Sequence, residues 1–541
     1  MLFRSILLLL VSALLYVPFL GEVHLFDWDE INFAESAREM IETGDYLTVQ
    51  IEYQPFWEKP PLFIWFQVLS MKIFGINEFA ARFPNALAGF FTLMVLFFLG
   101  RKLYNTRFGI FWVVAYTCSI LPFLYFKSGI IDPWFNLFIF LGISNFAFLY
   151  FTKKSVNKTA RIFLSAFFIG LAVLTKGPVG LLMLLITAFG YFIISRFKIP
   201  VNIFQILLFL FVLMFVGGFW FILQILDGNS QIVSDFIEYQ IRLFQTEDAG
   251  HGGFFGYHFV ILLFGVFPAS IYALRGLSTI QSNTFNQDVY RRWMILLLIV
   301  VLIVFSIVKT KIVHYSSLAY FPITFLAAYA VYKTGNNRAR YRKWLTFLII
   351  FFGVLLSFLS GALTYLIRNK ELIIESGMIK DDFAIENLQA NVYWSGNEWM
   401  IGLLLFVGIL FYWFITKWNY VVAFMTIGIF TLAFTYTSLI VLTPKIEGYT
   451  QNAAIEFYKS KSQEDCYIRS LKFKSYGRLF YGKMQEPDHP DYNKTEWLLY
   501  GNIDKSAYFV MKSNRKELLK TSYPTLVLLY EKNGYVFCKR F

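Results

Sequence analysis

The chain has 541 residues, of which 57% are hydrophobic and 20% aromatic, while only 15% are charged. These values exceed what a soluble globular domain uses, and apolar runs long enough to cross a bilayer recur throughout. The formal net charge is +13, but the basic residues gather in alternate short loops. This is the positive-inside pattern of a multi-pass membrane protein, and it argues against binding of nucleic acid.

The first apolar span covers residues 5–20. No small-x-small cleavage site precedes Glu22, so we expect an uncleaved first transmembrane helix. Further spans are expected at 83–100, 108–126, 133–151, 162–175, 178–195, 203–226, 257–274, 293–308, 312–332, 344–366, 399–416 and 421–441. The expected fold is an all-α polytopic membrane protein with about 13 crossings. Its N-terminus lies in the cytoplasm and its C-terminus outside.

The outside loop between the first two spans, residues 21–80, is polar and rich in aromatic residues. A helix is expected at residues 29–44 and should end at Gly44, with an apolar face and a charged face. The charged face carries Glu35, Arg38, Glu39 and Glu42. A helix of this length and polarity should lie on the membrane surface. A second helix is expected at residues 62–74.

The composition changes sharply near residue 443, after which no spanning run occurs. A helix is expected at 453–461 and strands at 467–471, 507–511, 525–530 and 535–540, the last two forming a hairpin around Asn533-Gly534. Residues 1–442 therefore form a transmembrane domain, and residues 443–541 a small α/β domain on the outer face. Cys466 and Cys538 lie in this domain, where a disulfide is permitted, whereas Cys118 is expected to pack inside a span.

From residue 83 onward the span interiors contain almost no Asp, Glu, Lys or Arg. A lipid or polysaccharide transporter would place such groups at membrane depth, so that function is disfavoured. Ionisable residues gather instead at the outward-facing ends of the spans. They are Asp27, Asp29, Glu30, Glu58, Lys59, Lys127, Asp132, Lys176, His251, His258, Lys309, Lys311 and His314. Acids and cations together at the membrane boundary suit a substrate with a lipid tail and a phosphate head.

Glycosyl transfer from a polyprenyl phosphate requires cations at the departing phosphate and a carboxylate that deprotonates the acceptor. Lys59 and Lys176 are the best cation candidates, although a snorkelling lysine would also fit each position. Asp132 directly precedes Pro133, so it is either a site residue or a helix N-cap. The cluster around Asp29 also fits either a site or the first turn of a helix.

Two further groups of residues each fit two different roles. His251 and His258 could bind a divalent ion together with Glu58, but His258 also fits an interfacial anchor beside Tyr257. The group Lys309-Thr310-Lys311 with His314-Tyr315 either contacts phosphate or marks a membrane boundary.

Several motifs in residues 1–330 resemble those of a known family. They are Asp29-Glu30, Ala34-Glu35-Ser36-Ala37-Arg38-Glu39-Met40, Gly44-Asp45, Glu58-Lys59-Pro60, Ala81-Arg82-Phe83-Pro84, Leu174-Thr175-Lys176-Gly177-Pro178 and Lys309-Thr310-Lys311 with His314-Tyr315. In these the chain is similar to the C-type (GT-C) membrane glycosyltransferases of the protein-mannosyltransferase and lipid A aminoarabinose-transferase superfamily. The later spans and the tail match this family only in layout.

The resemblance implies an inverting glycosyltransferase of the bacterial inner membrane with a periplasm-facing site. It would move a sugar from a polyprenyl (undecaprenyl) phosphate to lipid A or another surface acceptor. A protein O-mannosyltransferase-like enzyme is the main alternative and differs only in the acceptor. Gly252-Gly253 stand where the aminoarabinose transferases usually carry a polar or basic residue, which leaves the donor and acceptor open.

The resemblance also assigns roles to individual residues. The catalytic candidates are Asp29, Glu30 and Asp132, with Asp29 as the base or acceptor-positioning group. The substrate-binding candidates are Lys59 and Lys176, which would bind the donor phosphate, and Arg38, Lys311, His314 and Tyr315. Glu58 and His251 would hold a zinc ion if the enzyme uses one; no other cofactor is expected.

Overall fold

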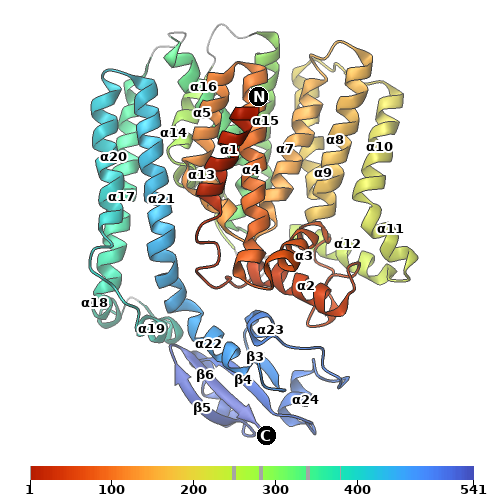
Figure 1. Cartoon of the computed structure of the whole chain (residues 1–541), viewed down its shortest axis with the longest axis vertical. Coiled ribbons are helices and arrows are strands. Elements are labelled where there is room, and N and C mark those ends of the chain that lie inside the picture. Colours follow the sequence, from red (N-terminus) through yellow and green to blue (C-terminus); the bar gives the residue numbers. More distant parts are fainter. Residues whose placement is uncertain (1, 246–251, 279–283, 337–340, 378) are drawn as a thin grey trace.

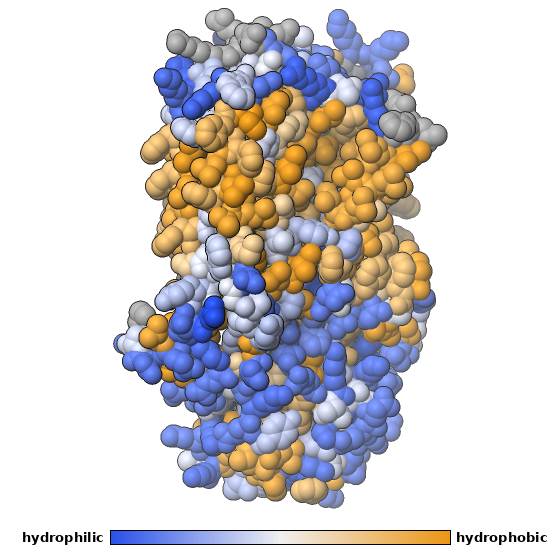
Figure 2. Space-filling view, turned by 60° about the vertical axis from the view of Figure 1, so that its left-hand side comes forward, coloured by the Kyte–Doolittle hydropathy of each residue, from blue (hydrophilic) through white to orange (hydrophobic). Residues whose placement is uncertain are grey.

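The computed structural model describes the chain apart from residues 1, 246–251, 279–283, 337–340 and 378. Figure 1 shows a tall bundle of roughly parallel helices, with a small unit of helices and strands beyond one end. The N-terminus lies at the opposite end of the bundle from that unit. On the face displayed in Figure 2, a broad hydrophobic belt separates two hydrophilic ends, as a protein surrounded by lipid requires.

Every expected span corresponds to one helix or to a broken pair. The helices of the bundle are α1 (Leu2–Tyr16), α4 (Glu78–Leu103), α5 (Thr106–Thr117), α6 (Ile120–Leu124), α7 (Asp132–Phe148), α8 (Ser155–Lys176), α9 (Val179–Ile194), α10 (Ile203–Gly217), α11 (Phe219–Leu226), α13 (Tyr257–Gly265), α14 (Ala269–Leu277), α15 (Phe285–Ile307), α16 (Tyr320–Gly335), α17 (Lys343–Arg368), α20 (Met400–Thr416) and α21 (Tyr420–Thr450). Short 3₁₀ segments, η1 (Tyr125–Lys127) and η2 (Val313–Ala319), precede α7 and α16.

Three of the expected spans are broken, which the apolar pattern did not reveal. The helix pairs bend by 83° after α5, by 56° between α10 and α11, and by 113° between α13 and α14. The second break falls at Gly218 and the third at Pro268, residues that weaken or interrupt a helix. Among the described residues, five helices are long and apolar enough to cross a bilayer, or up to eight if each bent pair is one span. The number of crossings therefore stays a prediction.

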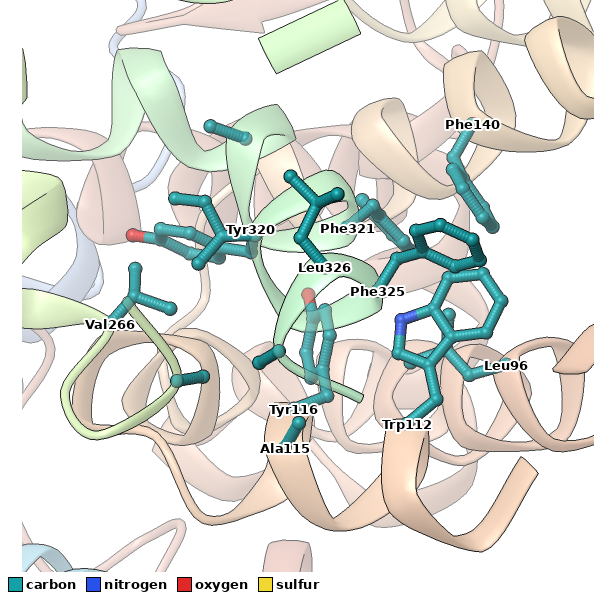
Figure 3. Packing of buried hydrophobic residues seen from close by; sticks show 14 of the residues in the cluster. Leu96, Trp112, Ala115, Tyr116, Phe140, Val266, Tyr320, Phe321, Phe325 and Leu326 are labelled. Carbon is teal, nitrogen blue, oxygen red and sulfur yellow. The ribbon is translucent and has the colours of Figure 1, made fainter. Parts of the chain in front are cut away.

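Helix α16 lies at the centre of the bundle and is buried on all sides from Tyr320 to Lys333. Figure 3 shows its Phe321 and Phe325 among side chains of α5 and α7. The Phe321 ring stacks on Phe140 with the ring centroids 4.2 Å apart. Trp112 of α5 donates from its indole N–H to the Thr324 hydroxyl at 3.1 Å. This packing fixes the segment η2, which immediately precedes α16.

The first loop folds into α2 (Asp29–Thr43), α3 (Leu62–Phe74) and a short hairpin of β1 (Gln50–Ile51) and β2 (Gln54–Pro55). Both helices occur where expected, and Gly44 ends α2 with a positive φ of 74°. The position of α2 at the membrane surface stays a prediction, but most of its charged face is not solvated. Glu35, Arg38 and Glu39 are all buried, because α2 packs between α3 and the C-terminal unit.

The C-terminal unit, residues 451–541, contains a four-stranded sheet in the order β3-β4-β6-β5. Its elements are α22 (Asn452–Lys461), β3 (Tyr467–Leu471), α23 (Gly477–Gly482), α24 (Thr495–Tyr500), β4 (Ala507–Lys512), η3 (Ser513–Arg515), α25 (Leu518–Thr521), β5 (Val527–Lys532) and β6 (Tyr535–Arg540). The expected helix and strands are confirmed, including the hairpin at Asn533 and Gly534, which both have positive φ. All three cysteines are free. Helices α18 (Lys370–Glu375) and α19 (Asp382–Leu388) lie between α17 and α20 in the chain, and α12 (Ser230–Gln245) follows α11.

Candidate active site

A cavity of about 750 Å³ lies where the bundle meets the first loop. One part of its wall is apolar and comes from bundle helices, including Phe135, Ile139, Met183 and Val304. The charged part of the lining consists of Asp27, Asp29, Glu30, Glu58, Lys59, Asp132, Lys176, Arg242, His314 and Lys474. An apolar wall that leads to a cluster of opposite charges can accept a molecule with a lipid chain and an ionic head.

Asp132 and Lys176 form an ion pair at the cavity end of the α7–α8 hairpin. Asp132 begins α7, and Lys176 is the last residue of α8, where Gly177 ends the helix with a φ of 102°. Because the two helices are antiparallel neighbours, the start of one meets the end of the other. The Lys176 Nζ lies 2.7 Å from the Asp132 Oδ1 and also 5.2 Å from the centre of the Tyr315 ring.

His314, in η2, connects this pair to the first loop. Its Nε2 lies 3.4 Å from the Asp29 Oδ2 and 3.8 Å from the Asp132 Oδ2. Asp132 is buried, whereas Asp29 is 42% exposed and faces the open side of the cavity.

Lys59 reaches the cavity from the segment before α3. Its ammonium lies 4.9 Å from the centre of the Tyr239 ring of α12, a favourable cation–π distance. Burial lowers the pKa of Lys59, and the neighbouring Glu58 carboxylate partly offsets that effect. The charges of Lys176, Asp29 and Asp132 also act on Lys59. Two lysines and two aspartates from four separate chain segments thus share one cavity.

Glu30 lines the same cavity, but its two oxygens are occupied by other parts of the protein. The Arg82 guanidinium donates to both of them, at 2.9 and 2.7 Å, and the backbone N–H groups of Phe26 and Gly129 donate at 2.9 and 2.5 Å. Burial would raise the pKa of Glu30, but Arg82 and these donors lower it below its usual value. Glu30 thus joins the first loop to α4 and to the segment before α7.

Two of the predicted substrate-binding residues, Arg38 and Lys311, do not line the cavity. The Arg38 side chain is buried and pairs with Glu35 at 2.7 Å and with the Met484 carbonyl at 2.8 Å. The Lys311 ammonium donates to the carbonyls of Phe305, Ser306 and Val308 at 2.8, 2.8 and 2.5 Å. These contacts hold the loop between α15 and η2. His314 and Tyr315, from the same motif as Lys311, do line the cavity.

Only one of the two residues assigned to zinc, Glu58, lies in the described part of the chain. Glu58 lines the cavity, whereas His251 lies outside the described residues. Within the part of the chain that the structure describes, no group of three or more His, Cys, Asp or Glu side chains is arranged to hold a metal ion. His258 points elsewhere, since its Nδ1 lies 3.0 Å from the Ser316 hydroxyl oxygen. The described residues thus do not fit a zinc site.

Some residues of the cavity were not predicted. Trp28 and Tyr239 contribute aromatic walls, Arg242 comes from α12, and Lys474 comes from the C-terminal unit. The Lys474 ammonium lies 4.7 Å from the centre of the Trp28 ring. Trp28 directly precedes the Asp29-Glu30 motif, but no motif lies beside Tyr239, Arg242 or Lys474. Their part in the cavity could not be predicted, because it depends on contacts between residues that are far apart in the chain.

Sequence relatives of the chain include membrane glycosyltransferases. Residues 58–220 match the family model of dolichyl-phosphate-mannose-protein mannosyltransferase. An undecaprenyl phosphate-α-4-amino-4-deoxy-L-arabinose arabinosyl transferase of Wigglesworthia glossinidia brevipalpis is 25% identical over 63% of this chain and 60% of its own length. An uncharacterised protein of Aquifex aeolicus is 28% identical over 44% of this chain and 47% of its own. The chain thus matches about half of the length of these relatives.

The structure extends the likeness to nearly the whole chain. The crystal structure of ArnT from Cupriavidus metallidurans bound to undecaprenyl phosphate superposes with a TM-score of 0.77, at 16% identity, over 99% of this chain and 97% of that protein. At this identity the superposition establishes the fold. Together the comparisons confirm the resemblance to the C-type membrane glycosyltransferases of the protein-mannosyltransferase and aminoarabinose-transferase superfamily, whose ArnT fold this chain has.

Proposed function

We propose that the chain is an inverting glycosyltransferase of the bacterial inner membrane, with the cavity facing the periplasm. It moves a sugar from undecaprenyl phosphate to lipid A or a similar lipid acceptor. One observation carries the proposal: Lys59 and Lys176 share a cavity with Asp29, Asp132 and His314, at the ends of apolar helices. The names of the arabinosyl transferase relatives and of the undecaprenyl phosphate-bound ArnT structure support this substrate class.

The two lysines bind the donor phosphate. The polyprenyl chain lies along the apolar wall of α7 and α9, which includes Ile139 and Met183. The phosphate then meets Lys59 and Lys176, and an interaction between opposite charges in a partly enclosed cavity is stronger than one in bulk solvent. As the bond between the sugar and the phosphate breaks, the charge that develops on the phosphate is stabilised by both ammonium groups.

Asp29 is the base. Its carboxylate is the more exposed of the two aspartates near His314, so an acceptor entering from the open side reaches it first. Asp29 takes the proton from the acceptor hydroxyl, and the acceptor oxygen forms a bond to the anomeric carbon as the polyprenyl phosphate leaves. Asp132 holds Lys176 in place through the 2.7 Å ion pair. The Nε2 of His314 lies 3.4 Å from Asp29 and 3.8 Å from Asp132, and so helps to position the Asp29 carboxylate.

The test is transfer by the purified protein from undecaprenyl-phosphate sugars to lipid A, with wild type compared with Asp29→Asn. Loss of a positioned general base costs roughly 10²- to 10⁴-fold in rate. Glu42→Gln is the matched control, because Glu42 lies on the same helix, is exposed and does not line the cavity. The control should keep the wild-type rate. Full transfer by a folded Asp29→Asn protein would move the base to Asp132.

A second candidate is transfer to protein, which the match to the mannosyltransferase family model favours. The two functions share the donor site and differ in the acceptor. Supplying lipid A and an unstructured Ser/Thr-rich peptide in parallel assays separates them. Transfer to the peptide alone would establish the second function.

A further inference from the structure

A second cavity, of about 590 Å³, lies at the end of the bundle opposite the C-terminal unit. It is formed by the last turn of α4, the loop between α7 and α8, and the first turns of α8 (Figure 1). Its residues are Lys102, Thr152, Lys153, Lys154, Asn157, Ala160, Arg161 and Leu164. Four of these residues are cations, and none is an acid.

Two of the cations are held close together by the protein itself. The Lys102 ammonium and the Arg161 guanidinium lie 4.7 and 4.9 Å from the centre of the same Phe148 ring. Asn145 accepts a hydrogen bond from Arg161 at 2.7 Å, which fixes the guanidinium. In the described residues no carboxylate forms an ion pair with any of the four cations. Like charges brought together without a counterion create a site for an anion.

The N-terminus of α8 also favours the binding of an anion in this cavity. Lys154 is the residue before the helix, and no side chain caps the N-terminus there. The first backbone N–H groups of a helix and its dipole favour a negative charge. Asn157, in the first turn, lines the cavity and supplies an amide that can donate to an anion.

Exposed apolar side chains beside the cavity indicate that the anionic group belongs to a lipid. On α8, next to the cavity, Val156 is 81% exposed and Phe163 is 45% exposed. Such side chains are covered by acyl chains when the bundle lies in a bilayer. Basic pockets between transmembrane helices are suited to phosphate head groups, and each Lys or Arg near an anionic membrane surface strengthens binding severalfold.

We propose that this cavity binds the phosphate group of an anionic phospholipid. The proposal is independent of the glycosyl-transfer site. It has one structural connection to that site: α8 and its loop to α7 line this cavity at one end, and the two helices carry Asp132 and Lys176 at the other. A lipid bound between Lys102 of α4 and Arg161 of α8 would therefore connect α4 to the hairpin that positions this ion pair.

The experiment measures lipid binding to the purified full-length protein in detergent by native mass spectrometry and by thermal unfolding. Phosphatidylglycerol is titrated against phosphatidylcholine, with wild type compared with Lys102→Gln/Arg161→Gln. Wild type should retain phosphatidylglycerol and gain in melting temperature, whereas the variant should bind it roughly tenfold or more weakly, given two lost cation contacts.

Arg342→Gln/Lys343→Gln is the matched control, because these exposed residues at the start of α17 lie at the same end of the bundle and outside the cavity. It should bind phosphatidylglycerol as wild type does. Equal binding by Lys102→Gln/Arg161→Gln and wild type, or an equal loss in the control, would overturn the proposal. A gain in melting temperature with inorganic phosphate equal to that with lipid would assign the site to free phosphate and reject a lipid. If the first variant fails to fold, Lys153→Gln/Lys154→Gln in the connecting loop tests the same prediction.

Discussion

Lys59 and Lys72 illustrate how position decides what a lysine near the membrane does. Lys59 is half-buried and lines the cavity beside Glu58, whereas Lys72, at the end of α3, is exposed with its ammonium 4.3 Å from the centre of the Tyr46 ring. Only Lys59 shares a cavity with the aspartates. From sequence alone both fit a snorkelling lysine.

We expect Lys59→Met to lower kcat/KM for the polyprenyl-phosphate donor by roughly 10²- to 10³-fold, the usual cost of removing one group that stabilises developing charge. Methionine keeps the length and the apolar packing against Tyr239, so the change isolates the charge. Steady-state kinetics with varied donor measure the effect. Lys72→Met should leave kcat/KM within about twofold of wild type; comparable losses in both variants would show that the ammonium of Lys59 has no special role.

Glu30 also lines the cavity, but its contacts with Arg82 lead us to expect that it contributes mainly to stability. Glu30→Gln leaves the buried Arg82 without its carboxylate, and breaking a buried pair in this way costs about 3–5 kcal/mol. We therefore expect a lower melting temperature, measured by thermal unfolding in detergent. Below that temperature the variant should keep far more activity than Asp29→Asn. Activity as low as that of Asp29→Asn in a protein of unchanged stability would instead make Glu30 a catalytic residue.

At the scale of elements, the sequence predicted the helices better than it predicted their surroundings. The positions of α2 and α3 follow from hydrophobic periodicity and from their terminal glycines. The burial of the charged face of α2 could not be inferred, because its partners lie far away in the chain: Arg38 bonds to the carbonyl of Met484. Lys59, Asp132, Lys176 and the Asp29 cluster were found because each lies beside Pro, Gly or a span end.

Glu52, in the hairpin of the first loop, connects that loop to the C-terminal unit. Its carboxylate lies 2.7 Å from both Arg469 and Arg478. Burial would raise the pKa of Glu52, but the two guanidinium groups lower it below the usual 4.5. A carboxylate with a lowered folded-state pKa stabilises the folded protein above its ordinary pKa, and this contribution is lost as the pH falls through the folded value.

We therefore expect Glu52→Gln to destabilise the docked C-terminal unit by about 3 kcal/mol at neutral pH, because two buried arginines lose their partner. Hydrogen exchange of α23 and limited proteolysis measure the loss. The wild type should lose its advantage over the variant as the pH falls below 4.5. Asp465→Asn, which removes an exposed pair with Lys505, should cost less than about 1 kcal/mol. A difference between wild type and Glu52→Gln that is independent of pH would contradict this account.

At the scale of the whole molecule, the cavity is completed by parts that lie at both ends of the sequence. The first loop supplies Trp28, and the C-terminal unit supplies Lys474, whose ammonium lies 4.7 Å from the centre of that ring. Local sequence patterns predict the first loop and the C-terminal unit separately. They do not predict the contact between the two, because many helices of the bundle lie between them in the chain. The three bent helix pairs also alter the geometry of the expected spans.

Lys474 is an exposed residue of the C-terminal unit that lines the cavity, whereas the apolar wall proposed for the donor chain comes from the bundle helices. We therefore expect Lys474→Met to raise the KM for lipid A severalfold, since one exposed cation contributes about 1 kcal/mol to binding an anionic head group. The KM for the donor and the slow release of sugar to water should stay unchanged. Steady-state kinetics with each substrate varied in turn measure the two KM values separately. Lys520→Met, which changes an exposed lysine elsewhere in the same unit, is the control. An unchanged KM for lipid A would mean that the C-terminal unit closes the cavity without contacting the acceptor. A raised KM for the donor would place the donor head group nearer to the C-terminal unit than proposed.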